Sequence, residues 1–164
     1  MKTSASNTVF SMIALFIILG ACESKDTVQP ETSLDASLAT IPDNPDYLSL
    51  PIIGTKWKLI GFADSGTNTI KLAKPSEGNT YTLIFEEDGT VSGVTSTNQA
   101  TGTYTLDGHA LQFTGWGGTK INELLDGPTY VKAIEQVYSY QLSEKGLILN
   151  YEAKKYLLFR PVDL

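Results

Sequence analysis

Apolar and polar residues alternate in short stretches over most of the C-terminal two thirds of the chain. In TKWKLIGFA, Trp57 and Leu59 lie on one side of an extended strand, and lysines lie on the other. Tyr81, Leu83 and Phe85 repeat the two-residue spacing in YTLIF. Such alternation is typical of strands that bury one face, so the pattern predicts a sheet.

Turn residues divide the alternating runs at regular points. Asp88-Gly89 and Asp107-Gly108 each separate two runs, and this dipeptide is a strong signal for a β-hairpin. Lys145-Gly146 and Ala153-Lys154 divide the C-terminal segment VYSYQLSEKGLILNYEAKKYLLF into three further strands. The pattern predicts about eight antiparallel strands in a curled sheet or partial barrel.

One segment, DGPTYVKAIEQV, has helical spacing instead. Pro128 suits the first turn of a helix, with Asp126 or Gly127 as the cap. The apolar stripe expected to face the sheet consists of Val131, Ile134 and Tyr138. We therefore expect a mostly β (α+β) domain over residues 51–164, with one helix packed on the sheet.

The N-terminus reads as a secretion signal. A basic residue is followed by an apolar stretch up to Ala21, which is too short to span a bilayer as a helix. The sequence Leu19-Gly20-Ala21-Cys22 resembles the lipobox of bacterial lipoproteins. That resemblance implies a signal peptide over residues 1–21, cleavage between Ala21 and Cys22, and lipid attachment at Cys22. The alternative is an ordinary signal peptide with an incidental cysteine.

The segment after the cysteine is polar and rich in proline. Its composition from Glu23 to Asp46 offers too little apolar surface to offset the cost of ordering, so we expect residues 22–50 to form a flexible tether. The chain has 18 acidic and 12 basic residues, a formal net charge of −6, which argues against nucleic-acid binding. The expected location is the bacterial cell envelope, where the lipid would anchor the protein in the outer membrane. The sequence does not decide between the periplasmic face and the cell surface.

Within the folded part, STNQATGTY carries Asn98, Gly102 and Tyr104 in an order that resembles the META domain of heat-inducible bacterial lipoproteins. The resemblance extends from about Thr55 to Val162 and rests on the ordered segments LIFEEDGTVSGVTSTNQATGTYTLDG, GTKINE and VYSYQL. Thr97 and Glu123 stand where the family carries a cysteine pair. The resemblance implies a role in envelope stress. It implies no particular chemical activity, and the absence of the cysteine pair rules out a disulfide at these positions in this chain.

Residues suited to catalysis are sparse. His109 is the single histidine, and its position after Asp107-Gly108 is explained by a polar turn. Glu86-Glu87-Asp88 could suggest paired carboxylates, but neighbours on a strand point to opposite faces, so a solvated hairpin end is the better interpretation. We expect no enzyme activity, no metal site and no cofactor.

Trp116 is the strongest candidate for a ligand contact. Glycines flank it in TGWGGTK, where an indole has little side-chain cover and could stack on a sugar or an apolar ligand. The alternative is a tryptophan that folds back to close one end of the barrel. With Asn98 and Tyr104, it forms the set of residues expected to contact a ligand or partner.

The leading hypothesis is a lipid-anchored envelope lipoprotein with a non-enzymatic binding or envelope-maintenance role, whose partner is an envelope protein or a small ligand. The alternative is a small β-barrel that carries an apolar or sugar ligand in its interior. Packing decides between them, because a filled interior leaves no room for cargo. The residues expected to fill it are Trp57, Leu83, Phe85, Leu111 and Phe113.

Overall fold

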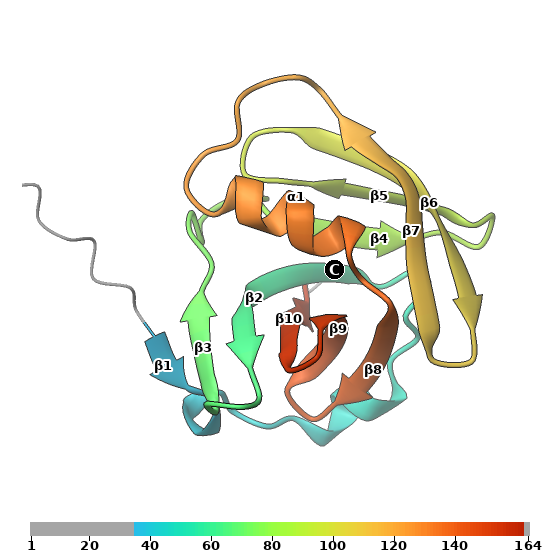
Figure 1. The fold of residues 1–164 in the computed structure, drawn as a ribbon. Coiled ribbons are helices and arrows are strands. Elements are labelled where there is room, and N and C mark those ends of the chain that lie inside the picture. Colours follow the sequence, from blue (N-terminus) through green and yellow to red (C-terminus); the bar gives the residue numbers. More distant parts are fainter. Residues whose placement is uncertain (1–34, 163–164) are drawn as a thin grey trace, which may run out of the picture. The chain divides into compact units, whose positions relative to one another are not determined.

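The computed structural model describes residues 35–162 (Figure 1). The predicted signal peptide, Cys22 and the first part of the predicted tether lie outside these residues. The strands are β1 (Asp35–Ser37), β2 (Lys56–Asp64), β3 (Thr69–Leu72), β4 (Thr82–Phe85), β5 (Thr90–Val94), β6 (Gln99–Asp107), β7 (Ala110–Gly118), β8 (Ser139–Ser143), β9 (Gly146–Glu152) and β10 (Lys155–Pro161). The helices are α1 (Gly127–Glu135) and two short 3₁₀ segments, η1 (Leu38–Thr40) and η2 (Pro45–Ser49).

All ten strands belong to one antiparallel sheet in the order β1-β3-β2-β10-β9-β8-β7-β6-β5-β4. Strand β2 also pairs with β4, so the eight strands from β2 to β4 in this order form a ring. The ring is weakest between β7 and β8, which are aligned only at Ala110 and Ser139. The predicted mostly β fold, with a curled antiparallel sheet and one helix, is confirmed, and the ring is not a regular barrel.

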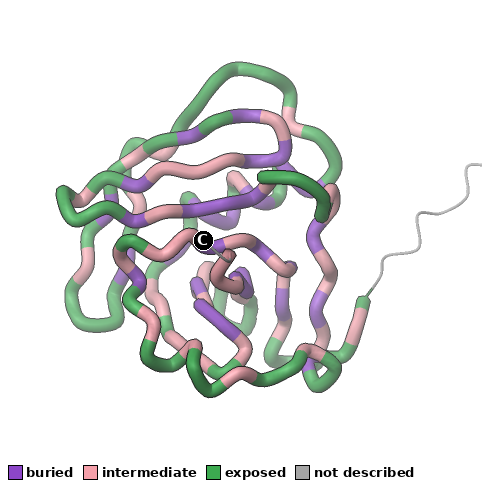
Figure 2. The backbone as a smooth tube through the Cα atoms, turned by 180° about the vertical axis from the view of Figure 1, so that it is seen from behind, coloured by how far each residue is buried: buried purple, intermediate pink, exposed green. Residues whose placement is uncertain are grey.

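The interior of the ring is filled by apolar side chains. Trp57, Leu83, Phe85 and Leu111 have no exposed surface, and Phe113 packs against them while partly buried. The indole nitrogen of Trp57 donates a hydrogen bond to the Ile52 carbonyl at 3.1 Å. Buried positions, purple in Figure 2, occur within the strands next to less buried ones, as in β2, where every second residue is buried. The alternation read from the sequence therefore gives the correct inner faces for these strands.

A second, smaller cluster lies where β1, β3, β2 and β10 adjoin. Leu158 and Ile70 are fully buried in it, and Leu38 of η1 is 6% exposed. The N-terminal segment is held there because β1 pairs with β3 over Asp35 to Ser37. Residues 35–50, which the composition assigns to the tether, therefore belong to the folded unit. A buried leucine, strand pairing and hydrogen bonds to distant residues, such as that from the Asn44 N–H to the Glu144 carbonyl, supply contacts that a mostly polar sequence does not reveal.

Helix α1 begins at Gly127 after the N-cap residue Asp126, with Pro128 in its first turn. The Asp126 side chain makes no capping bond; it accepts the Lys74 backbone N–H at 2.9 Å and the Lys71 ammonium at 2.5 Å. The face that packs on the sheet differs from the predicted stripe, because Tyr138 lies beyond the helix and is 48% exposed. The buried helical positions are Gly127, Tyr130, Ala133 and Ile134.

Candidate functional site

Strand β7 contains a bulge that sets the direction of Trp116. Gly115 and Trp116 together lie opposite Gly102 of β6, so β7 has one residue more than its partner. Gly115 has φ 64°, a conformation that glycine adopts readily. The extra residue shifts the alternation of β7, and Trp116 packs on the same core as Phe113, with ring centroids 6.0 Å apart.

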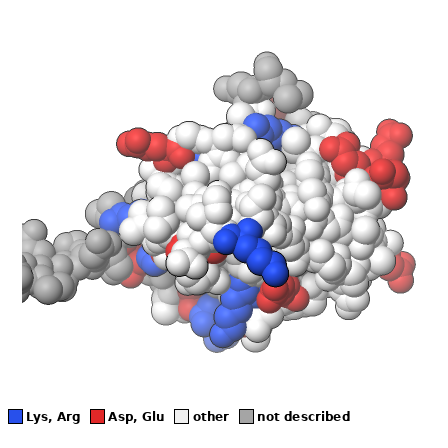
Figure 3. Space-filling model, turned by 90° about the horizontal axis from the view of Figure 1, so that it is seen from above, with Lys and Arg blue, Asp and Glu red and all other residues white. Residues whose placement is uncertain are grey.

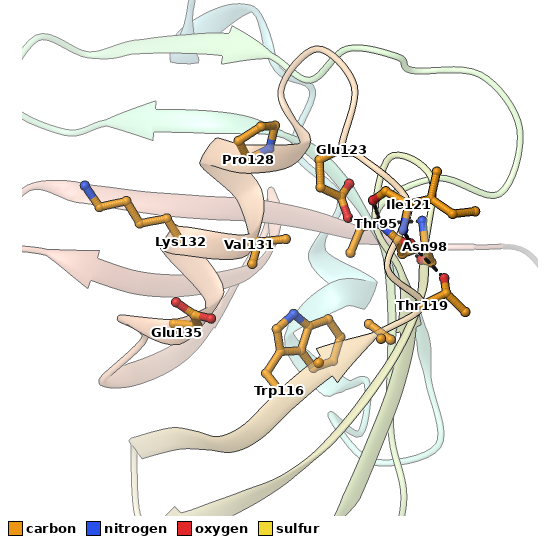
Figure 4. Close-up of a pocket in the computed structure, with 13 residues that line it drawn as sticks. Thr95, Asn98, Trp116, Thr119, Ile121, Glu123, Pro128, Val131, Lys132 and Glu135 are labelled. Atoms are coloured by element: carbon orange, nitrogen blue, oxygen red, sulfur yellow. Dashed lines mark hydrogen bonds between the residues drawn. The ribbon is translucent and has the colours of Figure 1, made fainter.

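A cleft of about 360 Å³ lies beside this tryptophan, between the end of β7, helix α1 and the turn that joins β5 to β6. Its volume is at the low end of the roughly 300–1,000 Å³ that ligand sites occupy. Figure 4 shows Trp116 on one side and Val131 of α1 facing it, with Glu135 and Lys132 along the helix. Glu123 and Asn98 form the opposite wall. The cleft is therefore built by segments far apart in the sequence.

The wall of the cleft is organised by the carboxylate of Glu123. It accepts hydrogen bonds from the Thr95 hydroxyl at 2.6 Å, the Asn98 amide at 2.5 Å, and both the hydroxyl and the backbone N–H of Ser96. Burial alone would raise the pKa of Glu123, but these hydrogen bonds outweigh it and hold the pKa below its ordinary value. Glu123 is thus an ionised, fully hydrogen-bonded structural group.

Asn98 lines the cleft, as expected for a contact residue, but its amide is already used by the protein. Its oxygen accepts from the Thr119 hydroxyl at 2.7 Å and the Ile121 N–H at 2.9 Å, and its nitrogen donates to the Ile121 carbonyl and to Glu123. These bonds tie the segment after β7 to the turn after β5. Asn98 shapes the cleft and has no amide atom left for a ligand.

The two positions at which the META domain carries cysteines lie in these same segments. The Thr97 hydroxyl donates to the Asn122 carbonyl at 3.1 Å, and Glu123 accepts from the residues on either side of Thr97. Hydrogen bonds therefore hold together the segments that a disulfide would join.

Tyr104, the third expected contact, does not line the cleft. It is 8% exposed, and its hydroxyl donates to the Glu86 carbonyl at 2.7 Å. Its ring packs edge to face on Phe85 with centroids 5.1 Å apart. The structure therefore brings Trp116 and Asn98 to one site and places Tyr104 in the core.

Three polar groups at the cleft have no protein partner among residues 35–162. They are the indole N–H of Trp116, the ammonium of Lys132 and the carboxylate of Glu135. Neither helical residue was predicted from the sequence, because a charged pair on a helix normally marks a solvated face. Their spacing of three residues places them on neighbouring turns of one side, but nothing local connects that side with Trp116.

The other candidates from the sequence do not form a site with these groups. His109 lies in the β6–β7 turn with its ring 5.8 Å from that of Tyr140. Glu86, Glu87 and Asp88 line a separate hollow, and Asp88 accepts hydrogen bonds from Thr90.

Residues 35–162 contain neither a metal-binding cluster nor a membrane-spanning helix. No group of three or more His, Cys, Asp or Glu residues within it could hold a metal ion. Nor does this part contain a helix with the length and hydrophobicity needed to cross a bilayer. On the face seen in Figure 3, charged side chains are spread over a larger uncharged surface.

Comparison with known proteins gives a family and a fold. No curated protein matches the chain. Among solved structures, an NMR structure of a protein from Burkholderia xenovorans is 22% identical, with a TM-score of 0.55, and the match covers 75% of this chain and 91% of that one. A crystal structure of a DUF4847 family protein from Bacteroides vulgatus is 17% identical, with a TM-score of 0.49 and coverage of 66% and 93%. The sequence pattern of the META domain family matches residues 50–163, and the chain therefore belongs to the META domain family.

Proposed function

We propose that this protein is a lipid-anchored binding module of the bacterial cell envelope, and that its binding site is the cleft beside Trp116. The observation that carries the proposal is the set of three unused polar groups around the indole. A surface cleft with an aromatic side chain and a few convergent polar groups is the usual form of a ligand site.

The chemistry of the cleft favours binding without turnover. Glu123 is held ionised by four hydrogen bonds, so it lacks the free lone pairs and raised pKa of a general base or acid. Glu135 is the remaining carboxylate of the cleft. A single carboxylate without a nucleophile beside it suits recognition of a ligand better than its conversion.

The sequence supports the proposed location. Leu19-Gly20-Ala21-Cys22 has the form of a lipobox, and two or more acyl chains at Cys22 would hold the protein stably at a membrane. We place the protein at the outer membrane in this proposal. The folded unit would then meet its partner at the membrane surface.

The packed interior also bears on the alternative hypothesis, in which the protein carries a small ligand. Trp57, Leu83, Phe85 and Leu111 leave no exposed surface inside the ring, so a cargo in the ring is disfavoured. A ligand carried by this protein would occupy the cleft at the β7–α1 side.

Photo-crosslinking in intact cells tests the proposal. A benzophenone amino acid is placed at Ile121, which lines the cleft but supplies none of the three unused groups, and separately at the exposed Lys154 in the β9–β10 turn as the control. We expect an envelope-fraction adduct with the probe at position 121 that is absent with the probe at 154 and absent when Trp116→Ala is added. Equal adducts at both positions, or none at 121, would contradict the proposed site.

A further inference from the structure

We propose that the cleft beside Trp116 binds a saccharide; this inference rests on the proposed function and names the ligand class of that site. The cleft joins an apolar surface, formed by the Trp116 indole and Val131, to the unused groups of Lys132 and Glu135. A sugar ring has the matching composition, because its C–H face is apolar and its edge carries hydroxyl groups.

The three unused groups differ in what they require of a ligand. The Trp116 N–H and the Lys132 ammonium only donate, whereas the Glu135 carboxylate only accepts. In Figure 4 the indole of Trp116 lies between Glu135 and the Glu123 wall, with Val131 above it. Hydroxyl groups both donate and accept, so one ring with several hydroxyls can satisfy all three groups at once.

Other small ligands fit this set less well. A hydrocarbon chain would cover Lys132 and Glu135 without replacing their hydrogen bonds to water, which is costly. An anion without hydroxyls would meet Lys132 but would be repelled by the carboxylates of Glu135 and Glu123. A simple cation would be attracted by the carboxylates but repelled by the ammonium group of Lys132.

An extended peptide is the competing occupant. The Leu111 N–H donates to the Tyr138 carbonyl, so the Phe113 N–H, two residues further along β7, points to the same side, where β8 no longer pairs. Strand addition would use such backbone groups. However, helix α1 lies beside β7 there (Figure 1), and its residues Val131 and Lys132 line the cleft. The unused groups in the cleft are side-chain groups, which favours the saccharide.

The two tryptophans allow a direct binding experiment on the full chain in a zwitterionic detergent without a sugar headgroup. The indole N–H of Trp57 is buried and bonded to Ile52, whereas that of Trp116 lines the cleft. Chitotetraose and cellotetraose are titrated while both indole ¹H–¹⁵N signals are recorded. We expect a saturable shift of the Trp116 signal, with a dissociation constant of about 0.1–5 mM, and a constant Trp57 signal.

Matched variants assign the binding to the three groups. Trp116→Phe removes the N–H, and Lys132→Met and Glu135→Gln each remove a charge from the rim of the cleft. Each should weaken saccharide binding about fivefold or more, measured by saturation-transfer NMR, because it removes a ligand hydrogen bond. Lys154→Met removes an exposed charge outside the cleft and should leave binding unchanged. Thermal unfolding confirms that each variant is folded.

Three results would overturn the saccharide inference. They are no Trp116 shift at about 10 mM of either sugar, a shift that Lys132→Met and Glu135→Gln leave unchanged, and a shift produced only by a capped Ala-Val-Ala-Val peptide. In each case a crosslink specific to position 121 would leave the proposed binding function standing. Loss of that crosslink as well would remove both.

Discussion

Tyr81 and Tyr130 pack edge to face in the core with ring centroids 5.1 Å apart, but among residues 35–162 only one of the two hydroxyls has a hydrogen-bond partner. Tyr81 donates to the Lys74 carbonyl at 2.6 Å. The Tyr130 hydroxyl is buried, and none of the described residues bonds to it. Burial, together with the charge of Asp126, raises the pKa of Tyr81 to about 12, and burial raises that of Tyr130 well above its ordinary value. Both rings are therefore neutral, and they differ in hydrogen bonding.

This pair predicts opposite effects for the same substitution. Tyr130→Phe removes a buried hydroxyl that makes no bond, so the free energy of unfolding should rise by about 1 kcal/mol. Tyr81→Phe removes a bonded hydroxyl and should lower it by about 1 kcal/mol. Urea unfolding of the full chain measures both. A clear loss of stability in Tyr130→Phe would show that its hydroxyl has a partner, such as a buried water molecule.

Glu123→Gln tests the hydrogen-bonded wall of the cleft. The amide nitrogen of glutamine would face donors from Thr95, Ser96 or Asn98, so at least one bond is lost and one donor is left without an acceptor. We expect the free energy of unfolding to fall by about 1–3 kcal/mol. Glu135→Gln is the control, because the Glu135 carboxylate bonds to no described residue, and its effect should stay within about 0.5 kcal/mol. Equal effects of the two variants would contradict the structural role of Glu123.

The same carboxylate predicts how stability depends on pH. The pKa of Glu123 lies below its ordinary value of 4.5 in the folded protein, so the ionised form stabilises the fold. This contribution is fully present above the unfolded-state pKa and is lost as the pH falls through the folded-state pKa. The stability difference between wild type and Glu123→Gln should therefore shrink below a pH of about 4.5. Urea unfolding at a series of pH values checks this, and a difference that grows on acidification would refute it.

Leu38→Ala measures how much the N-terminal segment contributes to the fold. Leu38 packs in the cluster of Ile70 and Leu158, and its replacement leaves a cavity there. We expect a loss of about 2–3 kcal/mol in the free energy of unfolding. Leu48→Ala is the control, because Leu48 is 51% exposed and should contribute little. An equally small effect at Leu38 would mean that the segment does not add to stability.

Features that depend on neighbouring residues were predicted correctly from the sequence, whereas features that depend on contacts between distant residues were not. Alternation around Trp57 and Leu83 is local, and it gave the strands and their buried faces. Leu38 looked unremarkable in a polar segment because its partners, Ile70 and Leu158, are distant in sequence. Composition measures the average polarity of a segment and does not register one buried side chain.

The cleft was predictable only in part for the same reason. The glycines around Trp116 indicated an accessible indole, and that residue does line the cleft. Its direction depends on a bulge that forms only when β7 pairs with β6. Lys132 and Glu135 join the site only because α1 packs beside β7. No local pattern in the sequence reports either event.

Cys22→Ser tests the proposed lipid anchor. Only a thiol can receive the diacylglycerol that precedes cleavage in the lipoprotein pathway, so the variant should keep its signal peptide or be cleaved elsewhere, and it should lose stable membrane association. Folding should be unaffected, because the contacts that hold the described fold together are made among residues 35–162. Metabolic labelling with a clickable fatty acid and the intact mass of the mature protein measure processing. Wild-type protein that takes up no label and begins at a residue other than Cys22 would overturn the lipoprotein assignment and leave an ordinary signal peptide with an incidental cysteine.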